Sequence, residues 1–509
     1  MNSEHGSLVE RGGLGWVAGL ALVHVVLAAA LGWALGAGAG FGWHAGLHAA
    51  LCVPLGLLAL PWFRRGRRGR GGAPAGGTGG SGSVLAVVVA AGVVSRLVLL
   101  AGAPVLSDDV YRVIWEGRVV VSGGDPWAQP PDDPGLAELR DAHPEVRARV
   151  GYWMLPAIYP PAHQLFAAAL AAFSTDARVM KAAFLVAEGF VVWALFGLLR
   201  RRGLPDLLLA GYLWNPLPLT EIAGSGHGEA LAVALLALGL LAFERGRPGL
   251  AGGLAALSGM VKYAGFAALP FLLRAARRRR DRAAMLLAAG AAVVIPLLPF
   301  LGPERLADGF LARFAEFGGT LVHYARHWQW GEGLFALLAA ALGAAARPVA
   351  FGLLAGFGLA LLVRRVPPTR AMGWLAGAGF LLAPTAHPWY LLWALPFLLL
   401  EPARRGPFFG CLLLSLTAVF SYGPFWTTPP GEAWVFPLGL RLAEYLPVAL
   451  VLIGFGWFAG ERSTRSEAAV VGDGEGRGVP GSEAVVDVHH GDAGGATVQE
   501  REKRGEPPV

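Results

Sequence analysis

Apolar segments of about 15 to 22 residues recur along the chain from Leu14 to Ala459, and they constrain its fold more than any other feature. A backbone inside lipid must satisfy its hydrogen bonds within the segment, so stretches of this length cross a bilayer as helices. Hydrophobic residues make up 55% of the 509 residues and charged residues only 15%, which leaves too little polar surface for a soluble protein of this size. The sequence therefore predicts an all-α, polytopic transmembrane helical bundle.

Clusters of Lys and Arg in the short loops set the predicted orientation, because such clusters favour the cytoplasmic side of a membrane. Placing all of them on that side predicts about fourteen spans with both termini in the cytoplasm. The clusters lie at 64–70, 200–203, 244–247, 274–282, 364–370 and 403–405. The predicted spans lie near 14–36, 44–62, 84–104, 180–199, 206–222, 229–243, 249–260, 263–273, 283–301, 347–363, 371–386, 388–400, 407–422 and 438–459. On this path 160–174 and 333–344 are external juxtamembrane or re-entrant helices that do not cross, and the large external segments are 105–179 and 302–346.

Composition divides the chain into three predicted parts. Residues 1–83 form an N-terminal extension with two spans and a flexible linker, residues 84–460 the main transmembrane domain, and residues 461–509 a disordered cytoplasmic tail. The net charge of +7 comes from the short basic loops, so it reports topology and predicts no nucleic-acid partner. Cys52 and Cys411 both lie inside apolar runs, which argues against a disulfide framework or a thiolate metal site.

An acid pair opens the first large external segment, in the stretch SDDVYRVIWEGRVVVSGGDPW (107–127). Asp108 and Asp109 lie at the mouth of an apolar span, where a reduced dielectric and a neighbouring acid raise a carboxyl pKa, as a general base requires. Tyr111 and Trp115 follow at helical spacing, and aromatic rings beside acids suit a sugar-binding surface. The alternative is an interfacial acid pair followed by aromatic anchors at the membrane surface.

Three further motifs lie between predicted spans on the same external side. Each holds polar side chains at a proline- or glycine-rich turn, for which a tight turn between helices is the alternative explanation. The motifs are IYPPAHQL (158–165) with Tyr159 and His163, NPLPLTEIAGSGHGEAL (215–231) with Glu221, His227 and Glu229, and TAHPWYLLWALPF (385–397) with His387.

Lys262 lies between two short apolar segments in LSGMVKYAGFAALP (257–270). An ammonium is costly to keep in apolar surroundings, so it indicates a functional site with an anionic partner such as a phosphate. Arg112 and Lys181 are alternative phosphate ligands, although extension of the Lys181 side chain to lipid headgroups explains that residue equally well. His323 and His327 have the spacing of a zinc-binding pair but no adjacent third ligand, so we predict no metal site.

The order of these motifs resembles that of the GT-C superfamily of integral-membrane glycosyltransferases, and most of all the bacterial polyprenyl-phosphate-mannose-dependent alpha-mannosyltransferases. The resemblance covers about residues 80–460 and implies a catalytic domain at 84–460 with juxtamembrane helices in its first large external loop. It implies an Asp of that loop as the catalytic base, matched here by Asp108 and Asp109. Asp108 suits the N-cap of the following helix, which favours Asp109 as the base.

The reaction that the resemblance implies is transfer of a hexose, mannose in that subfamily, from a polyprenyl-phosphate donor to a lipid or glycan acceptor on the external face. Some relatives use a divalent cation, and the sequence leaves that point open. Lys262, Arg112 and Lys181 are the candidates for donor-phosphate binding. The candidates for sugar or acceptor binding are Tyr111, Trp115, Tyr159, His163, His227, Glu229 and His387. The alternative function is a transporter or flippase of lipid-linked saccharides, in which the acids would form a coupling site.

Overall fold

The computed structural model describes residues 2–67, 78–303, 309–428 and 435–455. Within these ranges it contains helices and no β-strand, apart from one isolated bridge between Trp330 and Thr385. The predicted all-α fold is thereby confirmed. Residues 78–83 of the predicted linker (70–83) begin a helix, α3 (Thr78–Ala101), whereas its residues 70–77 and the predicted tail (461–509) lie outside the described residues.

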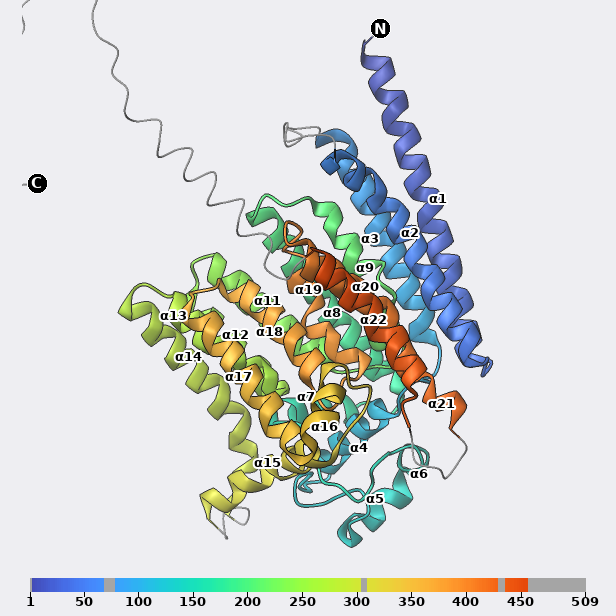
Figure 1. The fold of residues 1–509 in the computed structure, drawn as a ribbon. Coiled ribbons are helices and arrows are strands. Elements are labelled where there is room, and N and C mark those ends of the chain that lie inside the picture. Colours follow the sequence, from blue (N-terminus) through green and yellow to red (C-terminus); the bar gives the residue numbers. More distant parts are fainter. Residues whose placement is uncertain (1, 68–77, 304–308, 429–434, 456–509) are drawn as a thin grey trace, which may run out of the picture. The chain divides into compact units, whose positions relative to one another are not determined.

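Eight helical stretches among the described residues are long and apolar enough to cross a membrane. They coincide with eight of the fourteen predicted spans, and Figure 1 shows them as the long helices of the bundle. They contain α1 (Asn2–Gly36), α2 (Phe41–Arg67), α3 (Thr78–Ala101), α8 (Ala177–Arg201), α14 (Arg279–Leu297), α17 (Ala346–Val363), α20 (Arg405–Thr417) and α22 (Leu438–Phe455). The stretch containing α17 begins in α16 (Leu334–Leu342), which was predicted as a separate external helix, and Gly343 with φ +54° separates the two.

The other six predicted spans are short or interrupted helices. Three of them, 206–222, 263–273 and 388–400, change helix type along their length. Each contains proline, which has no backbone N–H to donate. Irregular backbone is tolerated at membrane depth where it is buried in protein, as most of these residues are. The remaining three are α11 (Glu229–Glu244), α12 (Pro248–Val261) and α18 (Pro368–Leu382). Of these, α12 packs inside the bundle, where it contacts both α11 and α14.

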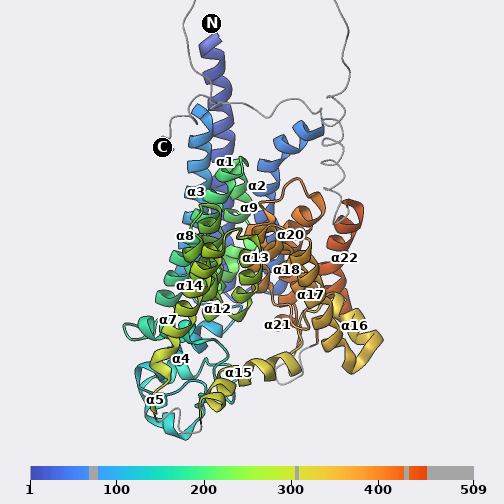
Figure 2. The same ribbon diagram turned by 90° about the vertical axis from the view of Figure 1, so that its left-hand side faces the viewer.

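The predicted external segments gather at one end of the bundle, which is the lower end in Figures 1 and 2. An ion pair of 2.7 Å between Asp125 and Arg313 links the two large external segments, and the Trp127 ring packs against Phe300 and Phe317. The helices at this end are α4 (Asp109–Val121), α5 (Ala137–Ala142), α6 (Pro144–Arg147), α7 (Pro161–Ala171), α15 (Phe310–His327), α16 and α21 (Pro424–Thr427).

Ion pairs join four of the predicted cytoplasmic loops at the opposite end of the bundle. Arg202 lies 2.6 Å from Glu244 and 3.6 Å from Glu401, and Arg370 lies 2.8 Å from Glu401. The loops at 200–203, 244–247, 364–370 and 403–405 therefore share one end, as the distribution of basic residues requires. Which side of the membrane that end faces stays a prediction.

Labelling of single cysteines tests the orientation. In a background without Cys52 and Cys411, we expect a cysteine at Ala128 to react with a membrane-impermeant maleimide in intact cells. A cysteine at Arg364 should react only after the membrane is opened. Both positions are exposed, so burial does not confound the comparison. Reaction at Arg364 in intact cells would contradict the orientation.

Candidate active site

The acid pair begins the first helix of the first predicted external segment. Asp109 is the first residue of α4 and Asp108 occupies the N-cap position, as predicted, but the Asp108 side chain makes no capping hydrogen bond. Instead the Ser107 hydroxyl accepts the Asp109 amide at 3.2 Å. Desolvation by the surrounding protein, followed by the charge of Asp109, raises the pKa of Asp108, and Arg149 partly opposes this. A carboxyl with a raised pKa takes a proton more readily than an ordinary aspartate.

His227 connects Asp109 to a buried carboxylate. Its Nε2 lies 3.8 Å from Asp109 Oδ2, and its Nδ1 lies 3.1 Å from Glu221 Oε2. The His227 and Glu221 side chains are 2% and 1% exposed, whereas the Asp109 side chain is 46% exposed. Glu221 also accepts the Tyr422 hydroxyl at 2.8 and 2.9 Å. The partly exposed Asp109 is thus the outermost acid of a chain of polar groups that leads into the protein.

Glycines allow the turn that carries His227. Gly226 has φ +79°, and a Cβ there would lie 2.8 Å from Cγ of Lys181 and 3.2 Å from a methyl group of Val110. A Cβ on Gly228 would lie 3.2 Å from the His163 ring. The turn therefore needs glycine both for its backbone conformation and for the close approach of α4, α7 and α8.

A second cluster lies around Lys262, which follows the last residue of α12. Its ammonium pairs with Glu229 at the first turn of α11, contacts the Tyr159 hydroxyl at 3.4 Å and lies 4.6 Å from the centre of the Tyr159 ring. The Tyr159 and His163 rings are 4.3 Å apart. Burial, then the charge of Lys262, lowers the pKa of His163 to about 3, so this imidazole is neutral at physiological pH.

Aromatic rings from a third segment cover His227. The Trp389 ring stacks on His227 at 3.9 Å and on His387 at 4.3 Å, between ring centres. Burial, then the charges of His227 and Lys262, lowers the pKa of His387 to about 3. The structure thus brings together six predicted site residues: Asp109, Tyr159, His163, His227, Glu229 and Lys262, with His387 one ring further out.

Two predicted phosphate ligands, Arg112 and Lys181, make contacts within the protein, and phosphate binding by either residue stays a prediction. Arg112 pairs with Glu116 at 2.6 Å and donates to the carbonyls of Tyr152 and Leu155. Lys181 Nζ donates to the carbonyls of Leu99, Leu100 and Gly102, at the C-terminal end of α3. A positively charged group stabilises the C-terminal end of a helix, which accounts for Lys181 without a ligand.

Two predicted sugar-contacting rings also have packing roles. Trp115 is 1% exposed and belongs to the hydrophobic core. Tyr111 is 7% exposed, and Arg149 lies over its ring at 4.9 Å and donates to its hydroxyl. A sugar contact for either residue stays a prediction.

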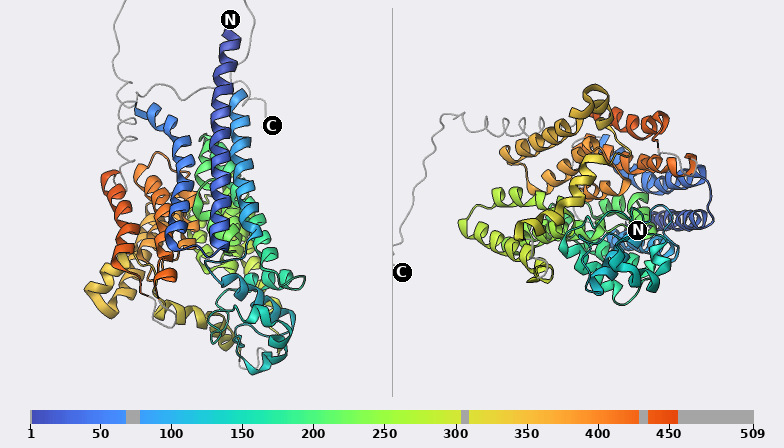
Figure 3. Two further views of the ribbon diagram at one scale, coloured as in Figure 1. Left: turned by 90° about the vertical axis from the view of Figure 1, so that its right-hand side faces the viewer. Right: turned by 90° about the horizontal axis from the view of Figure 1, so that it is seen from below.

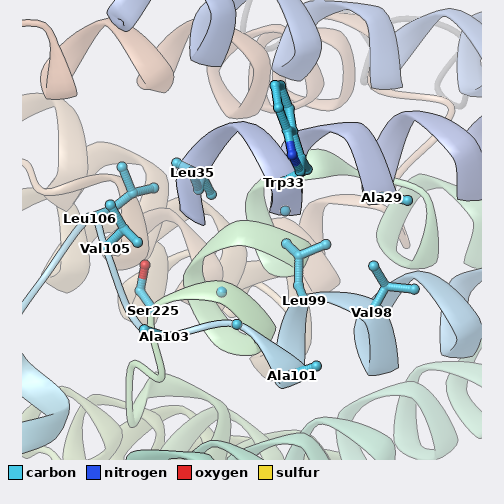
Figure 4. Close-up of a pocket in the computed structure, with 13 residues that line it drawn as sticks. Ala29, Trp33, Leu35, Val98, Leu99, Ala101, Ala103, Val105, Leu106 and Ser225 are labelled. Atoms are coloured by element: carbon cyan, nitrogen blue, oxygen red, sulfur yellow. The ribbon is translucent and has the colours of Figure 1, made fainter. Parts of the chain in front are cut away.

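A hollow of about 300 Å³ lies beside this region, between α1, the end of α3 and the turn before His227 (Figure 4). Its lining is mostly apolar and includes Ala29, Trp33, Leu99, Leu106 and Ser225. Leu106 is two residues before Asp108, and Ser225 is two residues before His227. The hollow and the acid cluster therefore share two chain segments.

Sequence reasoning did not select Tyr422 as a site residue. It lies in a predicted span 201 residues from Glu221, and only the fold brings the two side chains together. Glu221 was noted at the external turn, yet its partners were not predictable from spacing. Among the described residues, no group of three or more His, Cys, Asp or Glu side chains is arranged to hold a metal ion.

Fold and site together define a polytopic helical membrane protein with an acid and imidazole cluster at one end. Residues 13–278, just over half of the chain, match the family model described as alpha-(1->6)-mannopyranosyltransferase, N-terminal domain. The chain is also 25% identical over 419 residues to alpha-(1->6)-mannopyranosyltransferase B of Corynebacterium glutamicum, a match that covers 72% of this chain and 66% of that protein, just under two thirds of it. No solved structure matches the chain significantly. The chain belongs to the alpha-(1->6)-mannopyranosyltransferase family, which confirms the resemblance to membrane mannosyltransferases.

Proposed function

We propose that the protein is an integral-membrane mannosyltransferase that moves mannose from a polyprenyl-phosphate donor to a lipid or glycan acceptor on the external face. The observation that carries this proposal is the position of the Asp109 carboxylate beside His227, within the segment that matches the mannosyltransferase family. Family membership disfavours the transporter alternative.

The proposed reaction is one displacement at the anomeric carbon. The acceptor oxygen forms a bond to that carbon, the bond from the carbon to the phosphate oxygen breaks, and the phosphate leaves with its polyprenyl chain. Asp109 takes the proton from the acceptor hydroxyl, while Lys262 offsets the charge that develops on the leaving phosphate. The anomeric configuration is inverted.

Lys262 suits the phosphate role because of its partners. An ammonium has three N–H donors, and Glu229 and Tyr159 engage two of them. The Glu229 carboxylate and the Tyr159 hydroxyl orient the ammonium. A phosphate oxygen of the donor then accepts the remaining N–H. Burial, then the charges of Asp109, Glu229 and Glu116, raises the pKa of Tyr159 well above its usual value, so its phenol stays protonated.

A transfer assay in detergent separates the two functions. We expect the purified protein to cleave labelled polyprenyl-phosphate mannose and to lengthen an added oligomannoside acceptor. Detergent removes the compartments that a flippase would connect, so a flippase would give no product in this assay. Intact donor after prolonged incubation with acceptor would contradict the proposed activity.

The hollow next to the acids supports a lipid-borne substrate, because apolar walls at membrane depth suit an isoprenoid chain. We expect Ala29→Trp, which fills the hollow, to raise the KM for a long-chain polyprenyl donor about 10-fold while changing the KM for a short-chain donor little. Val26→Trp is the matched control, because Val26 is 58% exposed on the same helix and does not line the hollow. Equal effects of the two variants on both donors would exclude this hollow as the chain site.

A further inference from the structure

Glu221 has no role in the proposed reaction, although it is one of the most buried acids in the protein. It lies in a π-helical segment, η3 (Leu219–Gly224), and is 1% exposed. π-Helical turns are rare and frequently occur at functional sites. Its carboxylate has two partners, the Tyr422 hydroxyl and the Nδ1 of His227. A buried carboxylate with an imidazole partner is one part of the arrangement by which enzymes orient a catalytic group.

Contacts on one face and at one nitrogen fix the orientation of the His227 ring. Trp389 stacks on its face at 3.9 Å, and the Glu221 carboxylate and backbone carbonyl both lie within 3.2 Å of Nδ1. The opposite nitrogen, Nε2, is buried and has no hydrogen-bond partner among the described residues. Asp109 Oδ2 lies 3.8 Å from this nitrogen. The ring thus directs an unpaired nitrogen at the proposed base.

The charges around His227 favour its protonated form. Asp109 on α4, Glu221 on η3 and Glu229 on α11 are the acids that act on it, and the neutral His387 lies on the far side of the Trp389 stack. Burial by itself lowers the pKa of His227, but the hydrogen bond and charge of Glu221, then the charges of Asp109 and Glu229, outweigh it and raise the pKa. The Tyr422 hydroxyl, an uncharged donor, hydrogen-bonds to both oxygens of the Glu221 carboxylate and holds it in place.

We propose that Glu221 is a positioning residue that acts on the Asp109 base through His227, which it holds as an imidazolium with Nε2–H directed at the Asp109 carboxylate. The inference rests on the proposed function and names a residue that the function does not itself require. The imidazolium orients the Asp109 carboxylate before the reaction. The proton from the acceptor goes to Asp109, and His227 keeps both of its own protons throughout.

Two substitutions at Glu221 separate charge from packing. Glu221→Gln keeps the size of the side chain and removes its charge, whereas Glu221→Asp keeps the charge and leaves a small cavity. Loss of the charge lowers the pKa of His227, so the imidazolium is lost at a lower pH. For Glu221→Gln we therefore expect the alkaline limb of the kcat profile to move to lower pH by about 1 unit or more. The KM for the donor should stay within about twofold, because Glu221 does not contact the donor.

Glu221→Asp should keep its alkaline limb near the wild-type position and retain more activity than Glu221→Gln at pH 8. If Glu221 only fills space, the order is reversed, because the cavity in the Asp variant costs more than an isosteric amide. The positioning role is overturned if the order is reversed, or if the alkaline limb of the kcat profile does not move in Glu221→Gln. If the wild type still transfers mannose, either result leaves the mannosyltransferase proposal standing. A wild-type protein that transfers no mannose removes the proposed function itself, and the positioning role with it.

Size-exclusion chromatography in detergent shows whether each variant is folded. If Glu221→Gln does not stay folded, His227→Gln replaces it in the same assay. The inference predicts that this variant loses the alkaline limb altogether, because no imidazolium remains to titrate. An alkaline limb at the wild-type position in His227→Gln overturns the inference.

Discussion

Replacing Asp109 by asparagine is expected to lower kcat for mannose transfer by about 10²- to 10⁴-fold, the usual contribution of a general base. The amide is nearly isosteric with the carboxylate but cannot take the proton of the acceptor hydroxyl. Asp109 is 46% exposed and its closest recorded ionic contact is His227 at 3.8 Å, so folding and membrane insertion should be unaffected. The measurement is kcat at saturating donor, with the melting temperature of each purified variant recorded in parallel.

Asp133→Asn is the matched control for this experiment. Asp133 lies in the same external segment, and its Oδ1 accepts the Gly135 amide at 2.8 Å, a bond that asparagine can keep. It should retain wild-type turnover. Asp108→Asn should fall between the two, because Asp108 adjoins the proposed base and the two side chains interact electrostatically. If Asp108→Asn is inactive and Asp109→Asn is not, Asp108 is the base. If both variants keep wild-type turnover, the base lies elsewhere.

Replacing Lys262 by methionine is expected to weaken donor binding about 10- to 100-fold, the effect of losing one charge-assisted hydrogen bond to a phosphate. The same change leaves the fully buried Glu229 carboxylate without its cation. Removal of one partner of a buried pair typically costs about 3–5 kcal/mol of stability. Lys262→Met should therefore show both a weaker donor affinity and a lower melting temperature.

A second substitution at Glu229 separates these two effects. The double variant Lys262→Met with Glu229→Gln removes the unpaired charge, so its melting temperature should recover while its donor affinity stays weak. Glu229→Gln alone keeps the ammonium and should bind the donor at least as tightly as the wild type. Recovery of donor affinity in the double variant would show that Lys262 acts through stability and does not bind the phosphate.

Most of the fold followed from segment length and the distribution of charge. Long apolar runs allow only a helix in lipid, so seven of the eight long spans were predictable to within about five residues, and the exception is the stretch that begins in α16. The interrupted segments at 206–222, 263–273 and 388–400 were not, because hydropathy does not distinguish a continuous helix from a chain that changes helix type inside the protein. Those interruptions carry or directly adjoin Glu221, His387 and Lys262, and so they build much of the site. The left-hand view of Figure 3 shows the helices of the predicted external segments gathered at the lower end of the bundle.

The site was predictable only as a set of turns at one end of the bundle. Spacing placed Asp109 and His227 at external turns and Lys262 between two short apolar segments, and the structure brings these positions together. Spacing did not show that Arg112 and Lys181 would bind backbone carbonyls, because those carbonyls come from distant segments. It also gave no sign of the Tyr422 to Glu221 contact, since a tyrosine inside an apolar span has no local signature.

The most direct test of the account is an experimental structure of the protein bound to a non-hydrolysable phosphonate analogue of polyprenyl-phosphate mannose. We expect the phosphonate oxygens within hydrogen-bond distance of Lys262 Nζ and the anomeric carbon on the Asp109 side of the sugar. A donor bound at the end that carries Arg202 and Glu401, or with its anomeric carbon turned away from both Asp108 and Asp109, would contradict it.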